Sequence, residues 1–96
     1  MAEMKIDLHG LGTQEALRKL VRDYNAYVRS GGRAPVHIVH GYGSSGRGGA
    51  IQRAVRDYIT ANRGRFDGVI EGEAFANPGD TIVYPRRLLP ESRAGK

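Results

Sequence analysis

Residues 36–50 read VHIVHGYGSSGRGGA, and this stretch joins a short apolar run, a glycine-rich segment and the start of a helical pattern. The apolar positions of residues 36–39 predict a strand that ends at His40. Five glycines follow within residues 41–49, and an amphipathic helical pattern begins at Ala50. A strand, a glycine-rich loop and a helix N-terminus in this order gather backbone N–H groups in one place, which favours an anion such as phosphate.

The residues of the glycine-rich segment suit this role for different physical reasons. Glycine permits positive φ angles and a close approach of the backbone to a ligand, and Arg47 adds a permanent positive charge. Residues 41–46 also fit the G-x-G-x-x-G fingerprint of dinucleotide sites, but the strand before them is the second of the chain, and no lysine follows Gly46 as in a P-loop. The sequence therefore predicts phosphate binding without a nucleotide cofactor, by Gly41, Tyr42, Gly43, Ser45, Arg47 and Gly48.

The same pattern occurs once earlier in the chain. Residues 6–12, IDLHGLG, are again a short apolar run that ends in His-Gly-x-Gly, and residues 20–24 (LVRDY) match residues 54–58 (AVRDY) in the helical segments that follow. The parallel strands of such units end at one edge of a sheet, where ligands bind. We therefore expect His9 and His40 to face one shared site.

Hydrophobic periodicity elsewhere completes the predicted fold. A first helix that Thr13 caps and Gly31 ends, a second helix at residues 50–62, and further strands at residues 5–8, 66–72 and 81–84 are expected. The turn at residues 77–80 (NPGD) favours an antiparallel hairpin between the last two strands. The order is β-α-β-α-β-β, an α/β fold (an α+β sandwich) with a mixed four-stranded sheet packed with two helices.

Composition limits the class of protein. The chain of 96 residues is expected to form one domain, residues 1–85, followed by a basic, disordered tail, residues 86–96, in which residues 88–90 pack locally. The net charge is +5, and arginine, which binds phosphate as a bidentate fork, supplies 12 of the 15 basic residues. Nucleic acid is therefore the expected partner. The absence of cysteine and of an apolar run of membrane-spanning length predicts a cytoplasmic protein without a membrane partner.

Three motifs resemble one protein family. Residues 6–10, IDLHG, resemble the LDxHG motif that opens the small MutS-related (Smr) domain, residues 40–43 resemble its HGxG motif, and residues 79–83, GDTIV, resemble its Gly-x-Thr-Val-Val strand. This match covers residues 5–85. It implies a fold similar to the C-terminal domain of the third bacterial translation initiation factor, with DNA or RNA binding and often nicking endonuclease activity.

The resemblance also implies which residues act. In the family, the acid and histidine of the first motif and the loop of the second are linked to cleavage and binding, which carries over to Asp7, His9, His40, Gly41 and Gly43. One departure is Tyr42, which stands where many members have lysine or arginine. A cationic phosphate contact is lost there, although a tyrosine ring can stack on a base.

The residues themselves indicate an acid–base chemistry. Asp7 and His9 are two apart, so on a strand they share a face, and a carboxylate beside a histidine orients it and raises its basicity. We predict Asp7, His9 and His40 as catalytic: a histidine activates water or protonates the leaving oxygen, while Asp7 orients it or holds Mg²⁺ or Mn²⁺. No HxxxH or HxH pattern fixes a metal, so metal-free catalysis stays open.

The predicted function is therefore a nicking endonuclease that acts on DNA or RNA. A non-catalytic nucleic-acid-binding module is the alternative, and a binder of small phosphorylated molecules is a more distant one. The choice between DNA and RNA, the metal and the oligomeric state all stay open at this level.

Overall fold

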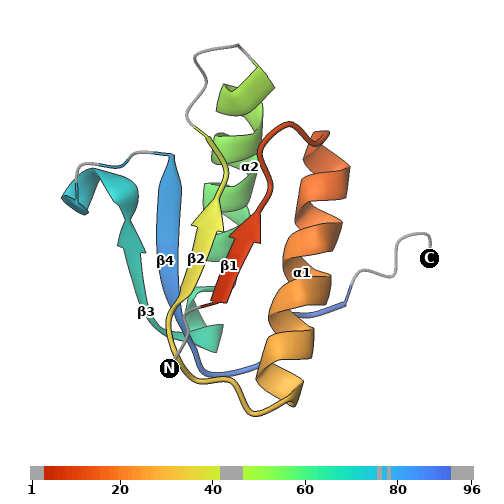
Figure 1. Cartoon of the computed structure of the whole chain (residues 1–96), viewed down its shortest axis with the longest axis vertical. Coiled ribbons are helices and arrows are strands. Elements are labelled where there is room, and N and C mark those ends of the chain that lie inside the picture. The colour runs from red at the N-terminus through yellow and green to blue at the C-terminus, as the bar shows by residue number, and fades with distance from the viewer. Residues whose placement is uncertain (1–3, 42–46, 76, 78, 92–96) are drawn as a thin grey trace.

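The computed structural model describes residues 4–41, 47–75, 77 and 79–91. In these residues the chain forms, in order, β1 (Met4–Asp7), α1 (Thr13–Arg29), β2 (Val36–Val39), α2 (Arg47–Ala61), the 3-10 helix η1 (Arg63–Arg65), β3 (Phe66–Glu71), the 3-10 helix η2 (Gly72–Phe75) and β4 (Asp80–Pro85) (Figure 1). The predicted order of strands and helices is confirmed.

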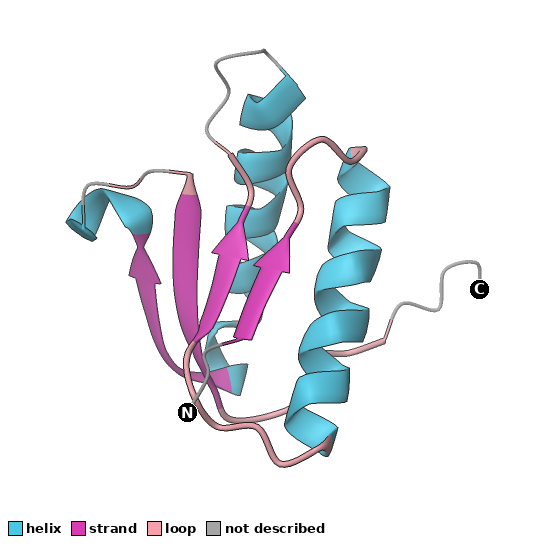
Figure 2. Ribbon diagram, in the orientation of Figure 1, coloured by secondary structure: helices cyan, strands magenta, loops and turns pink. Residues whose placement is uncertain are grey.

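The strands form one mixed sheet in the order β1-β2-β4-β3. β1 and β2 pair in parallel, from Met4 opposite Val36 to Asp7 opposite Val39, whereas β4 pairs antiparallel with both β2 and β3. The connection between the parallel strands runs through α1, as a crossover requires. Both β1 and β2 therefore point the same way and end at the same edge, which Figure 2 shows at the top of the sheet.

One face of the sheet carries the core. Alternate strand residues point to opposite faces, and the helices add an apolar stripe at helical spacing. The buried side chains include Ile6, Leu8, Val36, Ile38 and Val83 from the strands, Leu20, Val21 and Tyr24 from α1, and Ile51, Val55 and Ile59 from α2. Because both helices share one hydrophobic cluster with the strands, they cover the same face. None of the helices in the described ranges is long and apolar enough to cross a membrane.

The structure differs from the predicted boundaries in three places. Thr13 is the first residue of α1, and Gly12 precedes it as the N-cap without a side-chain hydrogen bond, so the predicted cap at Thr13 is wrong. α2 begins at Arg47 rather than at Ala50, so part of the glycine-rich segment is helical. The hairpin between β3 and β4 contains η2, so its connection is longer than the predicted turn.

The C-terminal segment lies against α1 as far as the described residues reach. Leu89 is buried, and its backbone N–H and carbonyl bond with the side chain of Asn25, at 2.8 and 2.9 Å. The hydroxyl of Tyr24 donates to the carbonyl of Arg87 at 2.8 Å. We name the two hydrogen bonds between Asn25 and Leu89 the Leu89 clamp. Residues 92–96 of the predicted tail lie outside the described residues.

The clamp gives a stability prediction. Asn25 is fully buried, so Asn25→Ala leaves the N–H and carbonyl of Leu89 without partners in the interior. Each unsatisfied buried polar group costs about 1–3 kcal/mol, so we expect a loss of roughly 2 kcal/mol or more in the free energy of unfolding, measured by urea denaturation. Asn62→Ala serves as the control: it removes one partly buried hydrogen bond, from the side-chain amide of Asn62 to the carbonyl of Tyr58 in α2. The expected loss in the free energy of unfolding is smaller. Equal losses of unfolding free energy in the two variants would contradict a special contribution of the Asn25–Leu89 hydrogen bonds to stability.

Candidate nucleic-acid interface

The two His-Gly motifs follow neighbouring strands. The N–H of Leu8 donates to the carbonyl of Val39 at 2.7 Å, which continues the parallel pairing of β1 and β2 to their carboxyl ends. His9 comes directly after this contact in one strand and His40 in the other. The structure thus places the two histidines at one edge of the sheet, as the repeat predicted.

The glycine after each histidine has the same backbone conformation. Gly10 has a φ of 83° and Gly41 a φ of 77°, both in the left-handed region that side chains disfavour. Apart from the neighbours in sequence, no atom of the described residues lies within 4 Å of the position that a Cβ would take at Gly10 or Gly41, so the positive φ explains the glycines. The repeat therefore extends to the backbone of the two turns.

Asp7 and His9 form an exposed acid–histidine pair. Asp7 Oδ1 lies 2.5 Å from His9 Nδ1 and accepts a second hydrogen bond from the backbone N–H of His9 at 3.2 Å. The side-chain hydrogen bond from His9 lowers the pKa of Asp7, so this carboxyl is ionised at neutral pH. Because an ionised carboxylate only accepts, Nδ1 carries the hydrogen, and Nε2 of this 70% exposed ring is left for an external partner.

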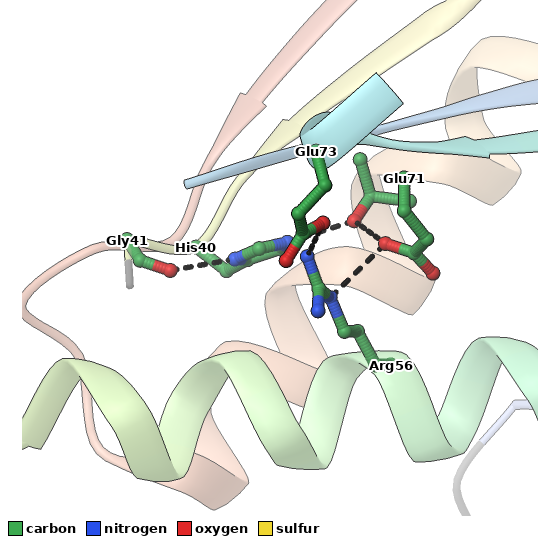
Figure 3. Close-up of polar contacts among 6 residues, drawn as sticks. His40, Gly41, Arg56, Glu71 and Glu73 are labelled. Atoms are coloured by element: carbon green, nitrogen blue, oxygen red, sulfur yellow. Dashed lines mark hydrogen bonds and ion pairs between the residues drawn. The ribbon is translucent and has the colours of Figure 1, made fainter. Parts of the chain in front are cut away.

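His40 has a different environment although its motif is the same. Its side chain is fully buried, with Nδ1 2.8 Å from the carbonyl of Gly41 and Nε2 2.8 Å from Oγ1 of Thr81 (Figure 3). Burial lowers the pKa of His40, and the charge of Arg56 adds to this effect. Both ring nitrogens thus have partners inside the protein, so His40 is not placed to exchange a proton with a substrate.

The polar contacts of His40 continue across the sheet to α2. Thr81 Oγ1 donates to Glu71 Oε1 at 2.7 Å. Arg56 Nε lies 3.0 Å from the same Glu71 oxygen as an ion pair that lacks the alignment of a hydrogen bond. Arg56 also donates to Glu73 at 2.6 Å (Figure 3). We name His40, Thr81, Glu71, Arg56 and Glu73 the His40 network.

Sequence reasoning missed the last four members of this network. Glu71 lies in the strand predicted at residues 66–72, and no motif marks Glu73 or Arg56 as a site residue. A usable signal was Thr81, a polar residue at the start of the strand motif at residues 79–83. Its partner His40 lies 41 positions away, so no local pattern connects the two.

The predicted phosphate-binding residues are described only in part. Tyr42, Gly43 and Ser45 lie outside the described residues, as does the side chain of Arg47. The backbone of Arg47 and Gly48 belongs to the first turn of α2. Gly41 is described, and its polar backbone groups bond within the protein. Its N–H donates to Gly79 at 3.0 Å, and its carbonyl accepts from His40. Gly41 therefore shapes the turn rather than offering an N–H to an anion.

The sequence leaves a metal ion open and names Asp7 as its possible ligand. No group of three or more His, Asp or Glu side chains within the described ranges is placed to hold a metal ion. Mg²⁺ and Mn²⁺ prefer oxygen ligands, and of the three predicted residues only Asp7 offers a carboxylate. His37 Nδ1, on the opposite side of β2 from the core, lies 3.9 Å from Asp80 Oδ2.

Comparisons with known proteins agree with this architecture. Residues 6–80 match the family model of the Smr domain. The Smr domain of Thermus thermophilus MutS2 is similar in fold, with a TM-score of 0.70 and 24% identity over 86% of this chain and 98% of that chain. The B3BP Smr domain has a TM-score of 0.64 and 27% identity over 85% of this chain and 77% of that chain. The Smr domain of NEDD4-binding protein 2 has a TM-score of 0.64 and 28% identity over 96% and 94%. No curated protein sequence matches the chain.

Proposed function

The chain belongs to the Smr domain family, and from this premise we propose that it binds nucleic acid and nicks it by hydrolysis of a phosphodiester bond at the Asp7–His9 pair. The observation that carries the proposal is the exposed ring of His9, hydrogen-bonded to an ionised Asp7 at the edge where β1 and β2 end. The glycine-rich segment follows the neighbouring strand at the same edge. A phosphate group bound where β1 and β2 end would lie beside the exposed imidazole of His9.

The pair has the parts needed for general acid–base catalysis. Nε2 of His9 accepts a proton from water as the water oxygen attacks phosphorus. The ring then gives this proton to solvent, and the leaving oxygen on the far side of phosphorus takes its proton from solvent water. Asp7 holds the ring with Nδ1–H toward itself and stabilises the imidazolium formed between the two transfers. In this proposal His9 alone moves the proton, and His40, predicted as its equal, has a positioning role.

The electrostatic part of the proposal concerns the phosphate backbone. Exposed arginines of the described segments lie on both helices and on the C-terminal segment, among them Arg18, Arg22, Arg53, Arg86 and Arg87. Contacts of this kind release counterions, so the affinity depends on salt. A small phosphorylated ligand makes few such contacts, which separates the more distant alternative from a nucleic acid.

We expect weak, salt-dependent binding, with a dissociation constant of about 10⁻⁶–10⁻⁴ M near physiological salt. Removing residues 92–96 deletes two basic residues, Arg93 and Lys96, and spares the Leu89 clamp. The slope of log K against log salt for a DNA duplex should then become shallower by up to about 1.8, since each phosphate contact contributes about 0.9. Fluorescence anisotropy over a salt series measures both slopes. A parent affinity that does not change with salt would contradict binding through phosphates.

The alternative function is a nucleic-acid-binding module without catalysis. One observation favours it: within the described residues, this edge presents a single exposed acid–histidine pair, and His40 is buried. An assay of supercoiled plasmid and of structured RNA, each with and without Mg²⁺ or Mn²⁺, decides between the two functions. Nicking that depends on His9 supports the endonuclease, whereas binding without nicking on either substrate supports the module.

A further inference from the structure

The His40 network joins four parts of the fold through one buried ring. His40 follows β2, Thr81 lies on β4, Glu71 ends β3, and Arg56 comes from α2. Thr81 is fully buried, as is His40, so the contact between them is sealed from water. A polar chain of this kind is costly to bury unless each member has a partner, which makes its geometry strongly constrained.

The hydrogens available to each group determine which nitrogen of the His40 ring donates and which accepts. The carbonyl of Gly41 can only accept, so His40 Nδ1 carries a hydrogen. Nε2 then has two options toward Thr81, which owns one hydroxyl hydrogen. With a neutral ring, Thr81 donates to Nε2. With a charged ring, Nε2 donates a hydrogen bond to Thr81 Oγ1, and the hydroxyl of Thr81 donates a hydrogen bond to Glu71. Both options require the hydroxyl of Thr81.

We propose that Thr81 is a positioning residue of the candidate nucleic-acid interface: its hydroxyl fixes the ring of His40 so that Nδ1–H holds the carbonyl of Gly41. This inference rests on the proposed binding of nucleic acid, and it assigns a role to a residue outside the predicted site. Thr81 does not touch the substrate in it.

The consequence is a fixed starting point for the glycine-rich segment. Gly41 has its N–H bonded to Gly79 and its carbonyl bonded to His40, at a φ of 77°. Losing the contact of His40 with Gly41 frees one of these two restraints. The backbone of Gly41 then samples a broader set of conformations, so binding that uses this turn costs more conformational entropy.

Substitutions at Thr81 test this role. Thr81→Val keeps the shape and suits a strand but removes the hydroxyl, whereas Thr81→Ser keeps the hydroxyl. We expect Thr81→Val to weaken binding of a labelled DNA duplex or RNA hairpin by about fivefold, the effect of one lost hydrogen bond, and Thr81→Ser to bind like the parent. Thr60→Val, an exposed threonine on α2, is the matched control and should bind like the parent.

A second readout does not depend on binding. Long-range ¹H–¹⁵N NMR spectra of the imidazole should show a hydrogen on Nδ1 of His40 in the parent and in Thr81→Ser, and ring averaging or an altered Nε2 signal in Thr81→Val. A parent ring with its hydrogen on Nε2 alone, or a ring signal and an affinity that are both unchanged by Thr81→Val, would overturn the inference. If the parent binds neither probe, the proposed function fails, while the NMR result still decides whether Thr81 fixes the ring.

Discussion

We expect His9→Ala to lower the nicking rate by about a hundred- to ten-thousandfold, because removal of a positioned proton-transfer group typically costs this much. Asp7→Asn should also lower the rate strongly, since an amide cannot stabilise the imidazolium and can turn its N–H₂ toward Nδ1. The loss for the double variant should fall well short of the product of the single losses, because the two groups act as one unit. Nicking of supercoiled plasmid, or cleavage of a structured RNA, measures these rates.

The fold should survive both changes, which makes the result interpretable. His9 is 70% exposed and Asp7 is 49% exposed, and exposed substitutions away from special features usually change stability by no more than about 0.5 kcal/mol. Affinity for nucleic acid should also stay close to that of the parent. Nicking that persists at the parental rate in His9→Ala preparations would point to a contaminating nuclease and would leave the binding module as the function.

Much of the architecture was predictable because its signals are local. Each strand of the parallel pair is followed by His-Gly-x-Gly and by an apolar helical stripe, and a helical connection of this length is the one that parallel strands need. The shared edge follows from these facts alone. The pair of Asp7 and His9 was also predictable, because residues two apart on a strand share a face.

The different roles of the two histidines could not be predicted from the repeat. His9 follows β1 at the border of the sheet, whereas His40 follows β2, which lies between β1 and β4. The inner position brings Thr81 of β4 against the ring and buries it. Two equal sequence motifs thus acquire unequal exposure from the strand order, which depends on contacts far apart in the chain.

The hydrogen bonds between Asn25 and Leu89 could not be predicted either, because they also join residues far apart in the chain. Leu89 is separated by 64 positions from Asn25, which has no local feature that marks it as the partner of a backbone segment. A polar residue at a core-facing position of a helix was the available sign, because buried amides nearly always have partners.

We expect His40→Ala to act on stability, in contrast to His9→Ala. The substitution leaves a cavity in the core and removes the partners of the Gly41 carbonyl and the Thr81 hydroxyl. Together these effects should lower the free energy of unfolding by about 3 kcal/mol or more. For a domain of this size that lowers the melting temperature by roughly 12 °C or more. Thermal unfolding followed by circular dichroism measures the loss, with His9→Ala as the control that should melt like the parent.

The pH dependence of the free energy of unfolding, compared between the parent and His40→Ala, checks independently whether burial lowers the pKa of His40. Burial lowers the pKa of His40 below its ordinary value of 6.5, so the unfolded chain binds a proton at a higher pH than the folded one. The parent should therefore lose stability as the pH falls below about 6.5, and keep this contribution in full above that pH. Asp7, whose pKa is also lowered, affects stability only below its ordinary value of 3.8, so the two effects occupy separate pH ranges. His40→Ala should remove the slope that the parent shows as the pH falls below about 6.5. A parent that gains stability on acidification in this range would show instead that the buried ring holds its proton, with Glu71 as the charge that retains it.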